Sequence, residues 1–163
     1  MTLRWTMLAA FLACAGCEKA DEHHPDVTSL PQVMAGYAKF EAAWQKEDLD
    51  GAMALFLPTA VVIDPVPPGR FVGTDAIRGW IEGSFQALDD ISITTTDLRM
   101  HIAGPAAWHT AHYVFEARQG SQPVRFEGDF TMNWLRMEDL NWRIAVFHAS
   151  HVPPPVEAPA KSP

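Results

Sequence analysis

Residues 91–102 read ISITTTDLRMHI, and residues 107–117 read AWHTAHYVFEA. Both stretches are rich in β-branched and aromatic residues, and apolar side chains recur in them with period two, as is typical of strands with one buried face. The same pattern recurs over residues 124–137 and 142–151. The second half of the chain therefore predicts four long consecutive strands, separated by turns at Gly104-Pro105, Gly120-Ser121 and Glu138-Asp139.

The first half of the chain predicts helices. Apolar residues recur at helical spacing over residues 31–45, and Pro31 suits the first turn of that helix. We expect a short second helix with Asp48 as its N-cap, ended by Pro58, and a third helix with Thr74 as its N-cap.

One short strand is expected between the second and third helices. Residues 60–63 (AVVI) are apolar and β-branched, and residues 64–69 (DPVPPG) have the composition of a turn. Helices followed by adjacent strands indicate an α+β fold. We expect the element order ααβ(β)αββββ, with a strongly curved antiparallel sheet forming a cone-like barrel around the helices.

Composition limits the classes of partner. A chain of 163 residues, 48% hydrophobic, can build one ordinary core. Its net charge of −8 and the absence of a basic stripe argue against nucleic-acid binding, because such a surface repels phosphates. We expect one domain over residues 30–151, preceded by a polar tether over residues 17–29 and followed by a proline-rich, disordered tail over residues 152–163.

The amino terminus has the pattern of a signal peptide over residues 1–16. Arg4 precedes an apolar, uncharged run that is shorter than the roughly 20 residues of a membrane-spanning helix. Ala15-Gly16-Cys17 resembles the lipobox of bacterial lipoproteins, which implies lipidation of Cys17 and a membrane anchor. The alternatives are lipidation at Cys14 and an unlipidated secretory leader. We expect a domain facing the periplasm in the cell envelope, and Glu18 after Cys17 favours the outer membrane.

Four segments carry a family resemblance. They are DLDGAMALF (48–56), AVVIDP (60–65), GTDAIR (73–78), and Trp142-Arg143-Ile144 with His148-Ala149-Ser150. Together they resemble the SnoaL-like and ketosteroid isomerase-like domains of the nuclear transport factor 2-like superfamily, over residues 30–151. That fold hosts isomerases, cyclases, dehydratases and inert binders, so the resemblance implies a fold without fixing an activity.

The resemblance implies a role for Asp64. It matches the aspartate that shuttles the proton in ketosteroid isomerase, and a carboxylate facing an apolar cavity has a raised pKa that suits a general base. The alternative is that Asp64 only opens the Asp-Pro turn. Phe40 falls at the position of the oxyanion tyrosine of the isomerase, with Tyr37 one turn earlier, and Met132 falls at or near its second oxyanion donor. Neither a phenylalanine nor a methionine side chain donates a hydrogen bond, and each oxyanion donor is worth about 2.7–4 kcal/mol. The resemblance therefore does not extend to steroid isomerisation.

Strand alternation adds two histidines to this hypothesis. His148 shares a side of its strand with Ile144 and Val146, and His112 shares a side with Trp108. If these sides face inward, both histidines meet Asp64 in one cavity and form an acid/base set near neutral pH. The alternative is a pair of structural core histidines.

A bulky apolar lining completes the predicted site. The side chains that we expect to line the pocket are Phe40, Trp44, Trp80, Trp108, Met132, Trp134 and Val146. They suit a small hydrophobic or aromatic ligand, with acid/base turnover of isomerase or lyase type by Asp64 and His148. The histidines lack metal-ligand spacing, so we expect neither a metal nor a cofactor. The alternative is a non-catalytic module that forms a homodimer or assembles an envelope complex.

Overall fold

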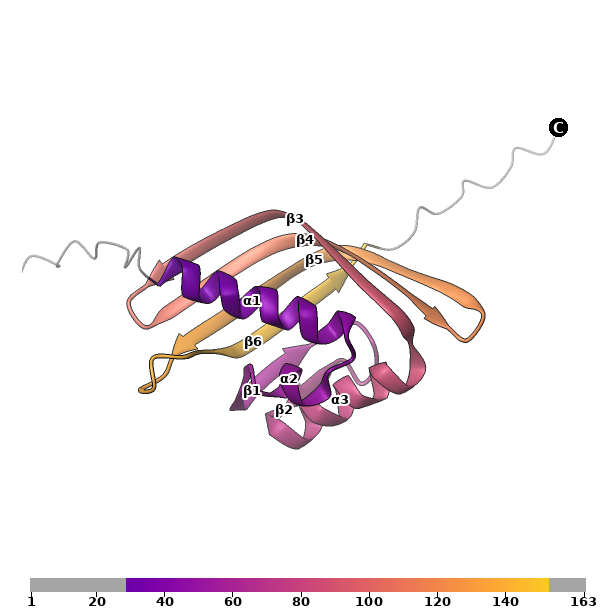
Figure 1. Cartoon of the computed structure of the whole chain (residues 1–163), viewed down its shortest axis with the longest axis horizontal. Coiled ribbons are helices and arrows are strands. Elements are labelled where there is room, and N and C mark those ends of the chain that lie inside the picture. Colours follow the sequence, from indigo (N-terminus) through magenta and orange to yellow (C-terminus); the bar gives the residue numbers. More distant parts are fainter. Residues whose placement is uncertain (1–28, 153–163) are drawn as a thin grey trace, which may run out of the picture.

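The computed structural model describes residues 29–152, which form three helices and six strands (Figure 1). The predicted signal peptide, Cys17 and nearly all of the tether and the tail lie outside the described residues. No helix among the described residues is long and apolar enough to cross a membrane. The elements are α1 Leu30–Gln45, α2 Leu49–Met53, β1 Phe56–Ile63, β2 Arg70–Val72, α3 Gly73–Ala87, β3 Asp89–Ala103, β4 Ala106–Gln119, β5 Gln122–Arg136 and β6 Trp142–His151.

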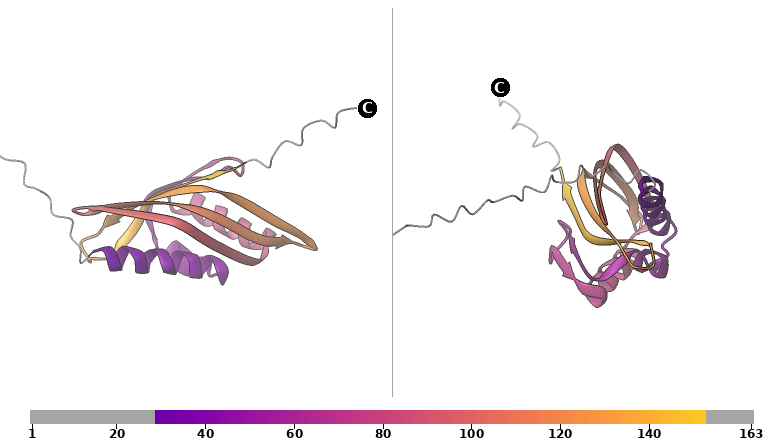
Figure 2. Two further views of the ribbon diagram at one scale, coloured as in Figure 1. Left: turned by 90° about the horizontal axis from the view of Figure 1, so that it is seen from above. Right: turned by 90° about the vertical axis from the view of Figure 1, so that its left-hand side faces the viewer.

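The six strands form one sheet in the order β2-β1-β6-β5-β4-β3. The expected α+β fold with a strongly curved sheet is confirmed, and α1 runs along one side of that sheet (Figure 2). The sheet is not closed, because its edge strands β2 and β3, which α3 connects, do not pair with each other. Nor is it wholly antiparallel, because β1 pairs with β6 in parallel.

The helices pack as their spacing predicts. Tyr37, Phe40 and Trp44 of α1 are buried, and Ile77 of α3 is fully buried. Arg78, the next residue, points outward and its Nη2 donates to Asp50 Oδ1 at 3.1 Å. The apolar stripes of both helices therefore face the inner side of the curved sheet.

Two boundaries differ from the sequence prediction. Asp48 caps α2 as expected and accepts a hydrogen bond from a backbone amide of its first turn. Pro58 does not end α2. The helix ends at Met53, and Pro58 lies inside β1, where the pairing with β6 is irregular and a ladder amide is not required. Thr74 does not cap α3, which begins one residue before it.

A β-bulge interrupts β6. Ile144 pairs with Trp134 of β5, but Val146 pairs with Asn133, so Ala145 is an extra residue without a partner. Because side chains alternate with period two, one extra residue turns all later side chains to the other face. After the bulge Phe147 is buried, whereas His148 is exposed.

Candidate functional site

A cavity of about 110 Å³ lies between the C-terminal half of α1, α3 and the inner face of β4–β6. It is partly open to solvent, and Val66, about half exposed, lies at its mouth. Aromatic rings make up most of its wall: Tyr37, Phe40, Trp44, Trp80, Tyr113, Phe115, Phe126, Phe130 and Phe147. Bulky side chains therefore narrow the cavity without filling it.

Three of the seven predicted lining residues, Phe40, Trp44 and Trp80, border this cavity. Met132 and Trp134 also face inward, but both are fully buried and fill the other half of the sheet face. There α1 lies so close that a Cβ at Gly36 would approach the Trp134 ring to 3.2 Å. Met132 and Trp134 are therefore core residues outside the cavity wall.

Trp108 and Val146 are on the outer face, and their placement in the pocket was wrong. Val146 follows the bulge at Ala145, which changes the side-chain alternation of β6. In β4 the buried residues on either side of Trp108 are Ala107 and His109, so the inward set is offset by one residue from the predicted set. Trp108 is 40% exposed and stacks on the ring of His101 at 5.3 Å.

Asp64 borders the cavity, directly after β1. Its Oδ1 also accepts a hydrogen bond from the backbone amide of Val66 at 2.8 Å. The predicted turn role and the predicted pocket position are therefore both present. Burial raises the pKa of the Asp64 carboxyl, while the Val66 hydrogen bond and the nearby His151 lower it.

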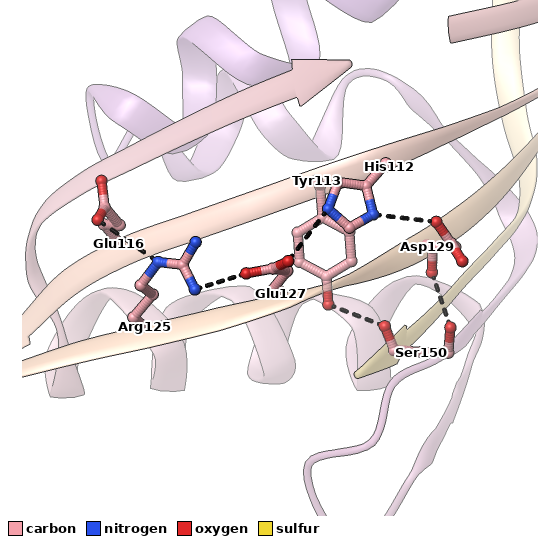
Figure 3. A network of polar contacts seen from close by, with 7 residues as sticks. All are labelled: His112, Tyr113, Glu116, Arg125, Glu127, Asp129 and Ser150. Atoms are coloured by element: carbon pink, nitrogen blue, oxygen red, sulfur yellow. Dashed lines mark hydrogen bonds and ion pairs between the residues drawn. The ribbon is translucent and has the colours of Figure 1, made fainter. Parts of the chain in front are cut away.

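His112 and His148 do not face the cavity, and this expectation was wrong. The bulge turns His148 outward, and the offset in β4 places His112 on the outer face. There His112 lies between two carboxylates: its Nδ1 is 3.2 Å from Asp129 Oδ1 and its Nε2 is 3.5 Å from Glu127 Oε1 (Figure 3). Arg125 extends this polar network, with its Nη1 at 2.6 Å from Glu127 Oε2.

The structure places two other polar side chains beside the pocket, Tyr113 and His151. Burial, together with the nearby Asp64 carboxylate, raises the pKa of the Tyr113 hydroxyl. The hydroxyl donates to the backbone oxygen of Ser150 at 3.3 Å. His151 stacks on Phe126 with ring centroids 4.7 Å apart. Sequence reasoning missed both residues, because each lies on the strand side that was predicted to face outward.

The sequence matches the model of a known domain family. The model of the SnoaL-like domain matches residues 33–155, which is most of the chain. The chain belongs to the SnoaL-like family. No curated protein matches the chain significantly.

Solved structures of low sequence identity share the fold of this SnoaL-like domain. A proposed dehydratase of the nuclear transport factor 2-like family from Streptomyces avermitilis is 19% identical, with a TM-score of 0.71 over 79% of this chain and 99% of that one. A nuclear transport factor 2-like superfamily protein from Salmonella enterica is 20% identical, with a TM-score of 0.70 over 83% and 98%. A ketosteroid isomerase-like protein from Erwinia carotovora is 14% identical, with a TM-score of 0.68 over 77% and 98%. At these identities the likeness shows the fold alone.

A buried histidine that sequence reasoning did not select lies beside the cavity of this SnoaL-like domain. His109 is fully buried, and its Nδ1 accepts a hydrogen bond from Trp134 Nε1 at 3.1 Å. This bond assigns the proton of the neutral ring to Nε2, which has no partner among the described residues. Burial lowers the pKa of His109 to about 4. His109 is therefore a neutral core group at pH 7.

The tyrosine closest to an oxyanion position is already engaged. The Tyr37 hydroxyl lies 2.7 Å from Glu41 Oε1 and 2.6 Å from Thr95 Oγ1, in a cluster that joins α1 to β3. Phe40, which matches the isomerase tyrosine, offers no donor. Within residues 29–152, no group of three or more His, Cys, Asp or Glu side chains is arranged to hold a metal ion. The pocket of this SnoaL-like domain thus combines aromatic packing with Asp64, Tyr113 and His151.

Proposed function

We propose that this SnoaL-like domain binds a small hydrophobic or aromatic molecule in its pocket and that Asp64 exchanges a proton with it. The reaction is of isomerase or lyase type and uses no cofactor. One observation carries the proposal: among the described residues, Asp64 is the sole carboxylate on a cavity walled mostly by aromatic rings. Such a cavity favours flat apolar ligands, and a carboxylate at its wall is the group able to accept a proton.

The electrostatics of Asp64 support this role. Burial raises the pKa of its carboxyl towards the range in which a general base works best at neutral pH. The solved structures of similar fold include a proposed dehydratase, which is a lyase by that description, and a protein described as ketosteroid isomerase-like. Steroid isomerisation is not part of the proposal, because Phe40 replaces the oxyanion tyrosine and Tyr37 bonds to Glu41 and Thr95.

Native mass spectrometry of the purified chain tests binding, since a ligand of the pocket is expected to co-purify as a discrete mass. With that molecule as substrate, Asp64→Asn is expected to lower turnover by about 10²–10⁴ while affinity changes less than tenfold, because the amide keeps the shape but is no base. Asp129→Asn, on the outer face, is the control and should leave turnover unchanged. Full activity of Asp64→Asn contradicts the catalytic role, and a chain that binds no small aromatic molecule contradicts the proposal.

We also propose that the domain is held in the cell envelope by lipidation of Cys17, facing the periplasm and with the outer membrane favoured. The apolar run before Ala15-Gly16-Cys17 and Glu18 after it support this. Cys17→Ser is expected to abolish incorporation of labelled fatty acid, whereas Cys14→Ser should leave it intact. The reverse result assigns the anchor to Cys14, and labelling that survives both substitutions contradicts lipidation at either residue.

A further inference from the structure

Two of the polar pocket residues lie in one row across three strands. Tyr113 of β4 pairs with Gly128 of β5, and Gly128 pairs with His151 of β6. Tyr113 and His151 both border the cavity, with their ring centroids 6.3 Å apart. Between them Gly128 contributes no side chain. The row therefore holds two polar rings that are not separated by a third side chain.

The chain does not accept a larger residue at position 128. A Cβ on Gly128 would lie 1.7 Å from the backbone oxygen of Ser150 and 2.8 Å from its carbonyl carbon. The colliding atoms belong to the backbone of β6, so rotation of a side chain does not relieve the clash. Figure 3 shows Ser150 at this place, bonded to Tyr113 on one side and to Asp129 on the other.

Asp64 joins the row from the turn after β1. Burial and then the Asp64 carboxylate raise the pKa of Tyr113, and burial raises the pKa of Asp64 while the nearby His151 lowers it. Only Oδ1 of Asp64 is used, by the amide of Val66. Within residues 29–152, no hydrogen bond engages Oδ2 of Asp64 or the ring nitrogens of His151. These atoms therefore retain the capacity to bond a ligand.

We propose that Asp64, Tyr113 and His151 form a polar subsite that selects neutral aromatic molecules carrying a hydroxyl group, of the phenol type. The proposal rests on the proposed function, because the ring of the ligand occupies the aromatic pocket. The hydroxyl donates to the unused oxygen of Asp64 and accepts from the ring of His151, and Tyr113 closes the subsite opposite His151. A hydrogen bond to a carboxylate is stronger than one between neutral groups.

The same subsite rejects two related classes of ligand. An apolar ligand of the same shape removes water from Asp64 without replacing its hydrogen bond, and an unpaired buried polar group is costly. A carboxylate ligand brings a like charge next to Asp64. The size of the cavity limits the subsite to a single ring. An engineered apolar cavity of about 150 Å³ holds one benzene, and this cavity, which is partly open to solvent, measures about 110 Å³. The rest of a larger ligand lies towards Val66 at the mouth.

Three probes of nearly equal shape test the proposal: p-cresol, p-xylene and 4-methylbenzoate. Each is titrated at pH 7 into the full chain carrying Cys17→Ser, and binding is followed by amide shifts in nuclear magnetic resonance spectra. We expect p-cresol to bind roughly tenfold more tightly than p-xylene, and 4-methylbenzoate more weakly than both. Asp64→Asn and His151→Phe should each bring the affinities for p-cresol and p-xylene within about threefold of each other.

His148→Phe is the matched control, because it places the same new side chain on the outer face of the same strand. It should leave the ratio of the two affinities unchanged. Equal affinity of the wild-type chain for p-cresol and p-xylene overturns the proposal of a polar subsite but leaves the proposal of pocket binding intact. An affinity ratio that is unchanged in both Asp64→Asn and His151→Phe has the same meaning. Failure of all three probes to bind contradicts the proposed function, and the subsite with it. The wild-type ratio decides the matter even where a variant does not fold.

Discussion

His109 and His112 lie three residues apart on β4 and face opposite sides of the sheet. His109 is fully buried among aromatic rings, and burial lowers its pKa to about 4. His112 is partly exposed and lies between the carboxylates of Glu127 and Asp129. The same type of side chain is thus desolvated without a charged partner on the inner face. On the outer face it is in contact with water and lies next to charged groups. Burial dominates the energetics of the inner face, whereas the outer face is dominated by screened charge pairs.

Two tryptophans, one on each face of the sheet, give the largest expected difference between the faces. Trp134→Ala is expected to lower the free energy of unfolding by about 3–5 kcal/mol, because it opens a cavity in the core and removes the donor to His109. Trp108→Ala, on the outer face, should cost only about 1 kcal/mol, since Trp108 is 40% exposed and stacks on one ring. Urea denaturation measures both, and equal costs would contradict the contrast.

The stability of the fold is expected to depend on pH through His109. Above pH 6.5 His109 is neutral in both the folded and the unfolded chain, so its contribution to stability is fully present. As the pH falls from 6.5 to about 4, His109 binds a proton in the unfolded chain but stays neutral in the folded chain. About 3 kcal/mol of stability is therefore lost.

The variant His109→Leu isolates this effect. The difference in free energy of unfolding between wild type and His109→Leu, measured by urea denaturation from pH 7.5 to 4, should shift in favour of the variant as the pH falls. His112→Leu is the control on the outer face: it keeps His109, so its free energy of unfolding should still fall by about 3 kcal/mol over the same pH range. A difference for His109→Leu that is independent of pH would show that His109 is not held neutral by burial.

The smallest effect is expected from the polar network of Figure 3. Because the pairs of His112 with Glu127 and Asp129 are open to solvent, His112→Ala should shift the melting temperature by about 2 °C or less. Any shift should shrink further in 0.5 M NaCl, as screening weakens exposed pairs. A large shift that is insensitive to salt would mean that this face is buried in solution by another molecule.

Elements that follow one period from end to end could be predicted from the sequence. The spacing of Tyr37, Phe40 and Trp44 identified the buried side of α1. Alternation also placed Met132 and Trp134 of β5 on the inner face, because no extra residue interrupts the side-chain alternation of β5 there.

The two strands that carry the misplaced histidines could not be predicted in the same way. In β4 both faces carry apolar residues, with Trp108 and Val114 outside and Tyr113 inside, so hydrophobicity does not choose between the two registers. In β6 nothing in the sequence around Ala145 marks an extra residue, and the bulge arises from pairing with β5. Residues beyond it, such as His151, therefore entered the site only through the structure.

The bulge in β6 also bears on how such a pocket changes during evolution. Point substitutions alter one wall residue at a time, whereas a regular place for Ala145 in the ladder would reverse the faces of residues 146–151 together. Phe147 and His151 would leave the pocket wall, and His148 would enter it. One strand therefore encodes two alternative linings, and loss of the codon for Ala145 would fix the present one, because it removes the extra residue and leaves the pairing of residues 146–151 unchanged.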